Sequence, residues 1–148
     1  MTASTTVPWG PAADGIDQPY WDGLCAGELR LQRCAECRTW IWGPQSICPQ
    51  CYSLRLVWVD VEPVGNVYTW NRSFYPFVKE LADELPYTTV LVELPHAGNR
   101  RVYGILIDDD ENPPRIGDRV TGFFEQRDGE PWPLLRWRRT TDAEGVTA

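Results

Sequence analysis

The sequence has a single histidine and no apolar run of the roughly 18 residues that a membrane-spanning helix needs. His96 stands beside Pro95 and Gly98, where the tip of a hairpin is expected, and no serine or cysteine has a credible histidine partner to activate it. The first residues also lack the basic start and apolar stretch of a signal peptide. We therefore expect a cytoplasmic protein with no catalytic residues and no activity of its own.

Basic side chains are outnumbered, with 14 lysines and arginines against 21 aspartates and glutamates. The net charge of -7 repels phosphates unless the arginines gather on one face, so nucleic acid is not the expected partner. A barrel that binds single-stranded nucleic acid nevertheless stays the alternative, because stacked aromatic side chains suit that function. Its stacking platform would consist of Tyr68, Trp70, Phe74 and Tyr103.

Four of the five cysteines form two Cys-x-x-Cys steps, Cys34 with Cys37 and Cys48 with Cys51, with ten residues between the pairs. Each step makes a tight knuckle that aims two thiolates at one point, and two knuckles supply the four ligands of a tetrahedral structural zinc site. Such a site has no open position for catalysis. The spacing also allows iron in a rubredoxin-like site or two disulfides, although the missing signal peptide favours reduced thiols.

The rest of the chain predicts one helix followed by β structure. A helix is expected over residues 19–26, with Asp17 as its cap and the unpaired Cys25 buried, and a strand at 28–33 then leads into the first knuckle. Five or six short strands in about 85 residues predict a small closed barrel. These strands are expected at 54–61, 66–72, 87–94, 101–107, 119–126 and 133–138.

The chain therefore divides into five parts. They are a flexible tail at 1–16, a helix and lead-in strand at 17–33, a zinc ribbon at 34–58, a barrel at 59–140 and a tail at 141–148.

Eight tryptophans, six tyrosines and four phenylalanines are more aromatic side chains than a small core usually buries, so some are expected at an interface. A long apolar insertion in a small barrel, here residues 73–86, is commonly a docking loop. The ribbon is in addition too small to bury two tryptophans fully by itself, although the alternative is that they pack its own core. The predicted partner-binding residues are Trp40, Trp42, Phe74, Tyr75 and Phe77.

Several short sequence motifs occur in an order that resembles a known family. They are LQRC followed by the first knuckle, CPQC, GNVYTW, PYTTVLVEL and IGDRV. Over residues 17–137 the chain resembles the zinc-ribbon and OB-fold family, long labelled a domain of unknown function, whose members accompany thiolase-like enzymes. Arg38 and Tyr52 depart from the family pattern, because glycine often follows each knuckle.

The resemblance implies a mainly β fold with an N-terminal helix, a rubredoxin-like zinc ribbon and a small OB-fold barrel. It implies a non-catalytic accessory subunit that supports a thiolase-fold enzyme acting on acyl-CoA thioesters, either an aldolase or an acyltransferase or synthase, with a MaoC-type hydratase as a further candidate partner. The Arg- and Trp-rich composition suits an actinobacterial origin, and for that branch the resemblance implies pairing with a retro-aldol lyase of steroid side-chain degradation. Guanidinium groups suit the phosphates of CoA, and the candidates are Arg100, Arg101, Arg136 and Arg138.

Overall fold

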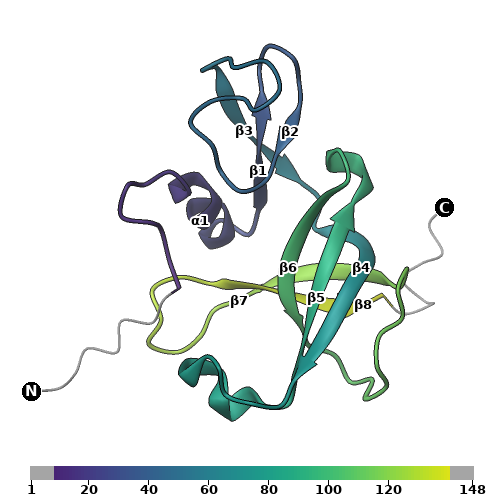
Figure 1. Cartoon of the computed structure of the whole chain (residues 1–148). Helices are drawn as coiled ribbons and strands as arrows, with labels where there is room; N and C mark the ends of the chain where they lie inside the picture. Colours follow the sequence, from purple (N-terminus) through teal and green to yellow (C-terminus); the bar gives the residue numbers. More distant parts are fainter. Residues whose placement is uncertain (1–8, 141–148) are drawn as a thin grey trace, which may run out of the picture.

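The computed structural model describes residues 9–140, which form a small three-stranded sheet and a closed five-stranded barrel beside a short helix (Figure 1). No helix in this range is long and apolar enough to span a membrane. The elements are α1 (Gln18–Cys25), β1 (Leu29–Cys34), β2 (Trp40–Ile41), β3 (Leu56–Val61), β4 (Val64–Ser73), the 3-10 helix η1 (Lys79–Glu84), β5 (Tyr87–Leu94), the 3-10 helix η2 (Pro95–Ala97), β6 (Arg100–Leu106), β7 (Arg119–Glu125) and β8 (Leu134–Arg139).

The barrel has the strand order β4-β5-β6-β8-β7, and pairing of β4 with β7 closes it. Neighbouring strands are antiparallel except β6 and β8, which run parallel. Strand β5 shows why the sequence makes such a wall: its residues alternate between buried and half-buried positions, and Val90, Val92 and Leu94 point into the core. The predicted class is confirmed, with mainly strands, an N-terminal helix, a ribbon and an OB-like closed barrel.

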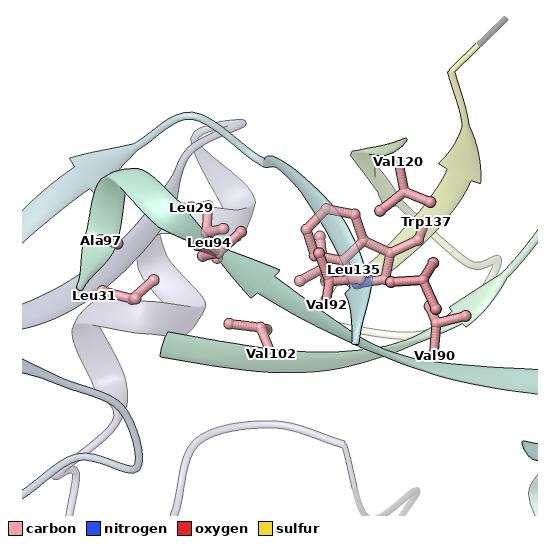
Figure 2. Close-up of a cluster of buried hydrophobic side chains, with 11 residues drawn as sticks. Leu29, Leu31, Val90, Val92, Leu94, Ala97, Val102, Val120, Leu135 and Trp137 are labelled. Carbon is pink, nitrogen blue, oxygen red and sulfur yellow. The ribbon is translucent and has the colours of Figure 1, made fainter. Parts of the chain in front are cut away.

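One hydrophobic core connects the ribbon to the barrel. Leu29 and Leu31 of β1 are fully buried in the same cluster as Leu94 at the end of β5 and Ala97 of η2, as Figure 2 shows. The cluster continues into the barrel around Trp137, which is 0% exposed. The ribbon and barrel therefore stabilise each other through shared apolar burial.

The ribbon sheet is longer than the predicted range of 34–58. Its strand order is β2-β1-β3, and the β1–β3 ladder extends from Cys34 opposite Leu56 to Leu29 opposite Val61. Strand β1 is thus part of the ribbon rather than a lead-in to it, and the barrel begins at Val64 instead of residue 59. The correction arises because strand pairing, which the sequence does not display, decides which sheet a segment joins.

Helix α1 is present within one residue of the predicted range, and Asp17 is its N-cap residue as predicted, but without a side-chain cap. The Asp17 carboxylate makes no capping hydrogen bond and accepts instead from the amide of Ala12 at 2.7 Å and from Trp21 Nε1 at 3.1 Å. It therefore fastens the preceding segment to the helix. Cys25 is exposed at the last turn, which corrects the expectation of a buried thiol. The predicted tails at 1–16 and 141–148 lie largely outside the described residues, which begin at residue 9.

Candidate functional site: a four-cysteine metal centre

The four knuckle sulfurs lie together. All four Sγ atoms are within 4.8 Å of one another, and the Sγ–Sγ distance is 3.6 Å both for Cys34 with Cys51 and for Cys37 with Cys48. Four sulfurs placed tetrahedrally about 2.3 Å from a zinc ion would be roughly 3.8 Å from one another, so the arrangement fits the metal. A disulfide requires about 2.05 Å, and all five cysteines are free. The alternative of two disulfides is therefore wrong.

The two knuckles repeat one backbone pattern. The amide of Arg38 donates to the carbonyl of Cys34 at 3.0 Å, and the amide of Tyr52 donates to the carbonyl of Cys48 at 2.9 Å. Arg38 and Tyr52 both adopt left-handed backbone conformations, with φ of 67° and 62°. These are the positions where glycine is common. The chain forms the same turns with two residues that carry a Cβ, at a conformational cost.

Hydrogen bonds support the thiolate form that a metal requires. The amide of Cys37 donates to Cys34 Sγ at 3.5 Å and lowers the pKa of that thiol, and the amide of Gln50 donates to Cys48 Sγ at 3.4 Å. The Thr39 hydroxyl lies 3.1 Å from Cys37 Sγ and lowers the pKa of Cys37 to about 6. Because the thiolate is the ligand, these contacts prepare Cys34 and Cys37 for a metal. The backbone of Ser53 also favours the thiolate of Cys51, but desolvation and the neighbouring cysteines outweigh it and raise the pKa of Cys51 to about 12.

Glycine at either left-handed position is expected to strengthen the ribbon. A residue with a Cβ costs about 1–2 kcal/mol in this conformation, whereas glycine adds about 0.5–1 kcal/mol of unfolded-state entropy, so Arg38→Gly or Tyr52→Gly should gain up to about 1 kcal/mol. The measurements are the melting temperature and the rate of zinc transfer to a chelator. Ala35→Gly, in the first knuckle but at an ordinary φ, should lower the melting temperature and speed the transfer of zinc to the chelator. Faster zinc loss from both glycine variants would contradict the strain argument.

The two ribbon tryptophans pack inside the molecule. Trp40 is half-buried where ribbon meets barrel: the Arg33 guanidinium lies 4.5 Å from its ring centroid, and a Cβ added at Gly98 would lie 2.9 Å from its Cδ1. Trp42 meets Tyr20 of α1 edge to face, with ring centroids 5.2 Å apart. Both rings pack against the shared core. They therefore hold the ribbon on the rest of the chain, and their partner-binding role stays a prediction.

The aromatic side chains of the insertion are exposed. Phe74, Tyr75 and Phe77 are 74%, 64% and 80% exposed, and the rings of Tyr75 and Phe77 lie 4.8 Å apart. They precede η1 at the side of the barrel away from the ribbon (Figure 1). An exposed aromatic cluster on a loop is what a docking element requires.

A second exposed apolar group lies on the ribbon itself and was missed from the sequence. Tyr52 is 74% exposed, Leu54 77% and Ile47 41%. The signal that would have identified them is the position of Tyr52 and Leu54 directly after the last ligand, in a turn too short to bury either side chain.

The four arginines proposed for CoA do not form one cradle. Arg100 Nε donates to the carbonyl of Trp40 at 2.7 Å, and Arg101 pairs with Glu93 at 3.0 Å while lying 3.6 Å from the ring centroid of Tyr68. These two arginines start β6 and stay partly accessible.

The other two arginines lie farther along the barrel. Arg136 is opposite Ile105, four residues from Arg101 on β6 and so about 13 Å away along the strand. Arg136 is also 2% exposed and pairs with Glu84 at 3.1 Å. This burial corrects the expectation of a surface phosphate ligand. Arg138 is exposed, with its guanidinium 6.0 Å from the ring centroid of Phe123.

The acidic loop between β6 and β7 is tied to the barrel by Arg139. Its Nε and Nη2 atoms donate to the two carboxylate oxygens of Asp108, each at 2.8 Å, and both side chains are 14% exposed. The hydrogen bond from Arg139 holds the pKa of Asp108 below its usual range. The Asp108–Arg139 ion pair is therefore a structural clamp on this loop.

Comparison with known proteins decides the nature of the ribbon. A family model described as the ChsH2 rubredoxin-like zinc ribbon domain matches residues 21–57, which include all four metal ligands. Residues 21–57 therefore resemble the ChsH2 rubredoxin-like zinc ribbon. The four clustered cysteines of this segment fit a structural zinc ion.

The comparisons also cover the barrel. A chain of the Ltp2-ChsH2(DUF35) aldolase superposes with a TM-score of 0.78 at 27% identity, over 89% of this chain and 100% of that one. A protein of unknown function from the DUF35 family of Sulfolobus solfataricus superposes with a TM-score of 0.55 at 14% identity, over 88% and 87% of the two chains, and shares the fold. The resemblance to the zinc-ribbon and OB-fold family is confirmed.

A curated relative is named as a hydratase subunit. The probable enoyl-CoA hydratase alpha subunit of Thermomonospora curvata is 33% identical over 91 residues, which cover 61% of this chain and 28% of the relative. This chain thus spans only about a quarter of the length of that protein.

Proposed function

We propose that this chain is a non-catalytic accessory subunit of an aldolase complex that acts on acyl-CoA thioesters. The observation that carries the proposal is the match to a chain of the Ltp2-ChsH2(DUF35) aldolase, which covers the whole of that chain, together with the ChsH2 ribbon model that matches residues 21–57 here. We further propose that the partner has a thiolase fold, that the reaction is a retro-aldol cleavage in steroid side-chain degradation, and that the complex works in the cytoplasm. Free cysteines suit that compartment.

The chemistry of the described residues supports an accessory role. His96 is exposed, and its Nε2 hydrogen-bonds the backbone carbonyl of Glu62 at 2.8 Å rather than a nucleophile. The zinc has four cysteine ligands and no place for water or substrate. Within residues 9–140, therefore, we find no group arranged to activate a nucleophile.

We propose that the exposed aromatic cluster of the insertion binds the partner. Phe74, Tyr75 and Phe77 would become buried on association, and aromatic anchors of this kind commonly dominate the binding free energy. The exposed Tyr52 and Leu54 of the ribbon are a secondary candidate contact. A thiolase-like acyltransferase or synthase would use the same surface, as would a MaoC-type hydratase, which the hydratase subunit name of the curated relative supports.

Phe77→Ala is expected to weaken partner binding at least tenfold. Truncating an anchor at an interface centre costs about 2 kcal/mol or more, while an 80% exposed side chain contributes little to the fold of the free chain. Affinity for the thiolase-fold partner is measured by calorimetry, and the melting temperature and zinc content of the free variant are measured alongside.

Ile116→Ala is the matched control, because Ile116 is also apolar and 74% exposed but lies on the loop between β6 and β7. It should leave affinity unchanged. Equal losses from both variants, or no loss from a Phe74→Ala and Phe77→Ala double variant, would reject the insertion as the docking element.

The class of function is tested by reconstitution. Aldolase activity on an acyl-CoA substrate is expected from the partner and this chain together, and not from this chain alone. Nucleic-acid binding, the alternative, would appear as salt-dependent affinity for single-stranded DNA. Its proposed platform is less available than expected, since the Arg101 guanidinium covers Tyr68 and pairs with Glu93.

A further inference from the structure

A pocket of about 350 Å³ lies between α1, the insertion and barrel strands β5, β6 and β8. Its volume is at the lower end of the range for small-molecule sites, about 300–1,000 Å³. The walls are mainly aromatic and aliphatic, and include Tyr20, Trp21, Val78, Leu81, Tyr103 and Leu134. Larger hollows of about 890 and 700 Å³ border the acidic loop, where the charged groups of Asp108 and Arg139 already satisfy each other.

One charged residue lines this otherwise apolar pocket. Arg136 is 2% exposed and donates one side-chain hydrogen bond, from Nη2 to Glu84 at 3.1 Å. A guanidinium has five N–H donors, and Arg136 Nε makes no hydrogen bond to any residue of the described range. This Nε lies 3.4 Å from Glu125 Oε2 in an ion pair without a hydrogen bond, so an acceptor bound at the guanidinium would add a hydrogen bond that the free chain lacks.

The charges around Arg136 define which acceptor suits it. Glu84 lies 3.1 Å and Glu125 3.4 Å from the Arg136 guanidinium, and Arg127 lies 3.6 Å from Glu84. The two negative charges of Glu84 and Glu125 therefore balance the two positive charges of Arg127 and Arg136. A further anion would meet the carboxylates without a spare positive charge, whereas a neutral carbonyl or hydroxyl needs only a donor.

We propose that this pocket binds a small neutral molecule with an apolar ring or chain and one hydrogen-bond acceptor, the apolar part lying against Trp21 and Tyr103 and the acceptor facing Arg136. The site is separate from the zinc centre. The inference does not depend on the aldolase partner, because the pocket is formed by this chain alone.

The test uses the neutral fluorophore 6-propionyl-2-(dimethylamino)naphthalene, which has two apolar rings, one carbonyl and an emission that shifts to the blue in apolar surroundings. The full-length zinc-loaded chain is expected to give a saturable, one-to-one blue shift. Thr89→Trp, which adds a large ring to the wall of the pocket, should reduce affinity at least tenfold. Arg136→Lys, which keeps the charge facing Glu84 but provides fewer donors, should reduce it several-fold.

A control variant makes the result specific. Ile116→Trp adds the same ring on an exposed loop that does not line the pocket, and it should bind the fluorophore as the unmodified chain does. Melting temperatures identify any variant that fails to fold. Absence of a saturable shift, or unchanged affinity in folded Thr89→Trp or Arg136→Lys, overturns the proposal. A Thr89→Trp variant that loses only partner binding would assign the pocket to a protein side chain instead. Failure of the aldolase assay would leave this fluorescence result unaffected.

Discussion

Cys48→Ser is expected to remove zinc from the protein and unfold the ribbon. Structural zinc contributes on the order of 10 kcal/mol in small ribbons, far more than the few apolar side chains packed around Cys34, Ile41 and Cys48. The damage should spread to the barrel, because Leu29 and Leu31 belong to the core that also contains Leu94. Elemental analysis should fall from about one zinc per chain to near zero, with a lower melting temperature for the whole protein.

Cys25→Ser is the control for the loss of zinc. Cys25 is exposed and is not one of the four clustered sulfurs, so this variant should keep its metal and its melting temperature. A Cys48→Ser chain whose barrel melts at the original temperature would show that the shared core does not couple the two sheets.

Trp137→Ala is expected to destabilise the barrel by about 3–5 kcal/mol, the usual cost of removing a large buried ring. Trp137 is 0% exposed, and two glycines of neighbouring strands make room for it: a Cβ on Gly104 would lie 2.5 Å from its Cδ1, and one on Gly122 would lie 3.1 Å from its Cζ3. For a chain of 148 residues the loss corresponds to a fall of roughly 6–20 °C in melting temperature.

The fit between Trp137 and Gly104 can be tested separately. Gly104→Ala alone should be destabilising because of the close contact, and Gly104→Ala added to Trp137→Ala should cost much less. Such non-additivity identifies direct contact. Tyr103→Ala, next to Gly104 but 67% exposed, should change stability by less than about 1 kcal/mol. Additive losses from Gly104→Ala and Trp137→Ala would contradict the packing described here.

The features that sequence predicts well here are local. The spacing of Cys34, Cys37, Cys48 and Cys51 is enough to define a metal site, because two knuckles of fixed geometry leave little freedom. The sequence predicts a strand at residues 87–94, where β5 is found, because this run is rich in β-branched residues and is bounded by turn residues.

The features that were missed depend on tertiary contacts. Arg136 is chemically suited to a phosphate, and only the approach of Glu84 from the insertion makes it a buried ion pair. The sequence suggests that Trp40 is an exposed anchor, but in the fold the turn at Gly98 packs against its ring. Asp17 has the side chain of a helix cap, yet Ala12 and Trp21 provide its hydrogen bonds. In each case the deciding partner is brought in by folding, and its identity is not encoded in the local pattern.

Strand β8 is the last barrel strand in the chain, and it pairs with β7 on one side and with β6 on the other. During synthesis on the ribosome, the barrel therefore cannot close until residues 134–139 have been made, and the edges of β6 and β7 stay unpaired until then. The ribbon faces no such delay, since β1, β2 and β3 pair within one short segment. Zinc can accordingly bind early, and the finished ribbon then presents Leu29 and Leu31 as a ready surface on which the later strands assemble.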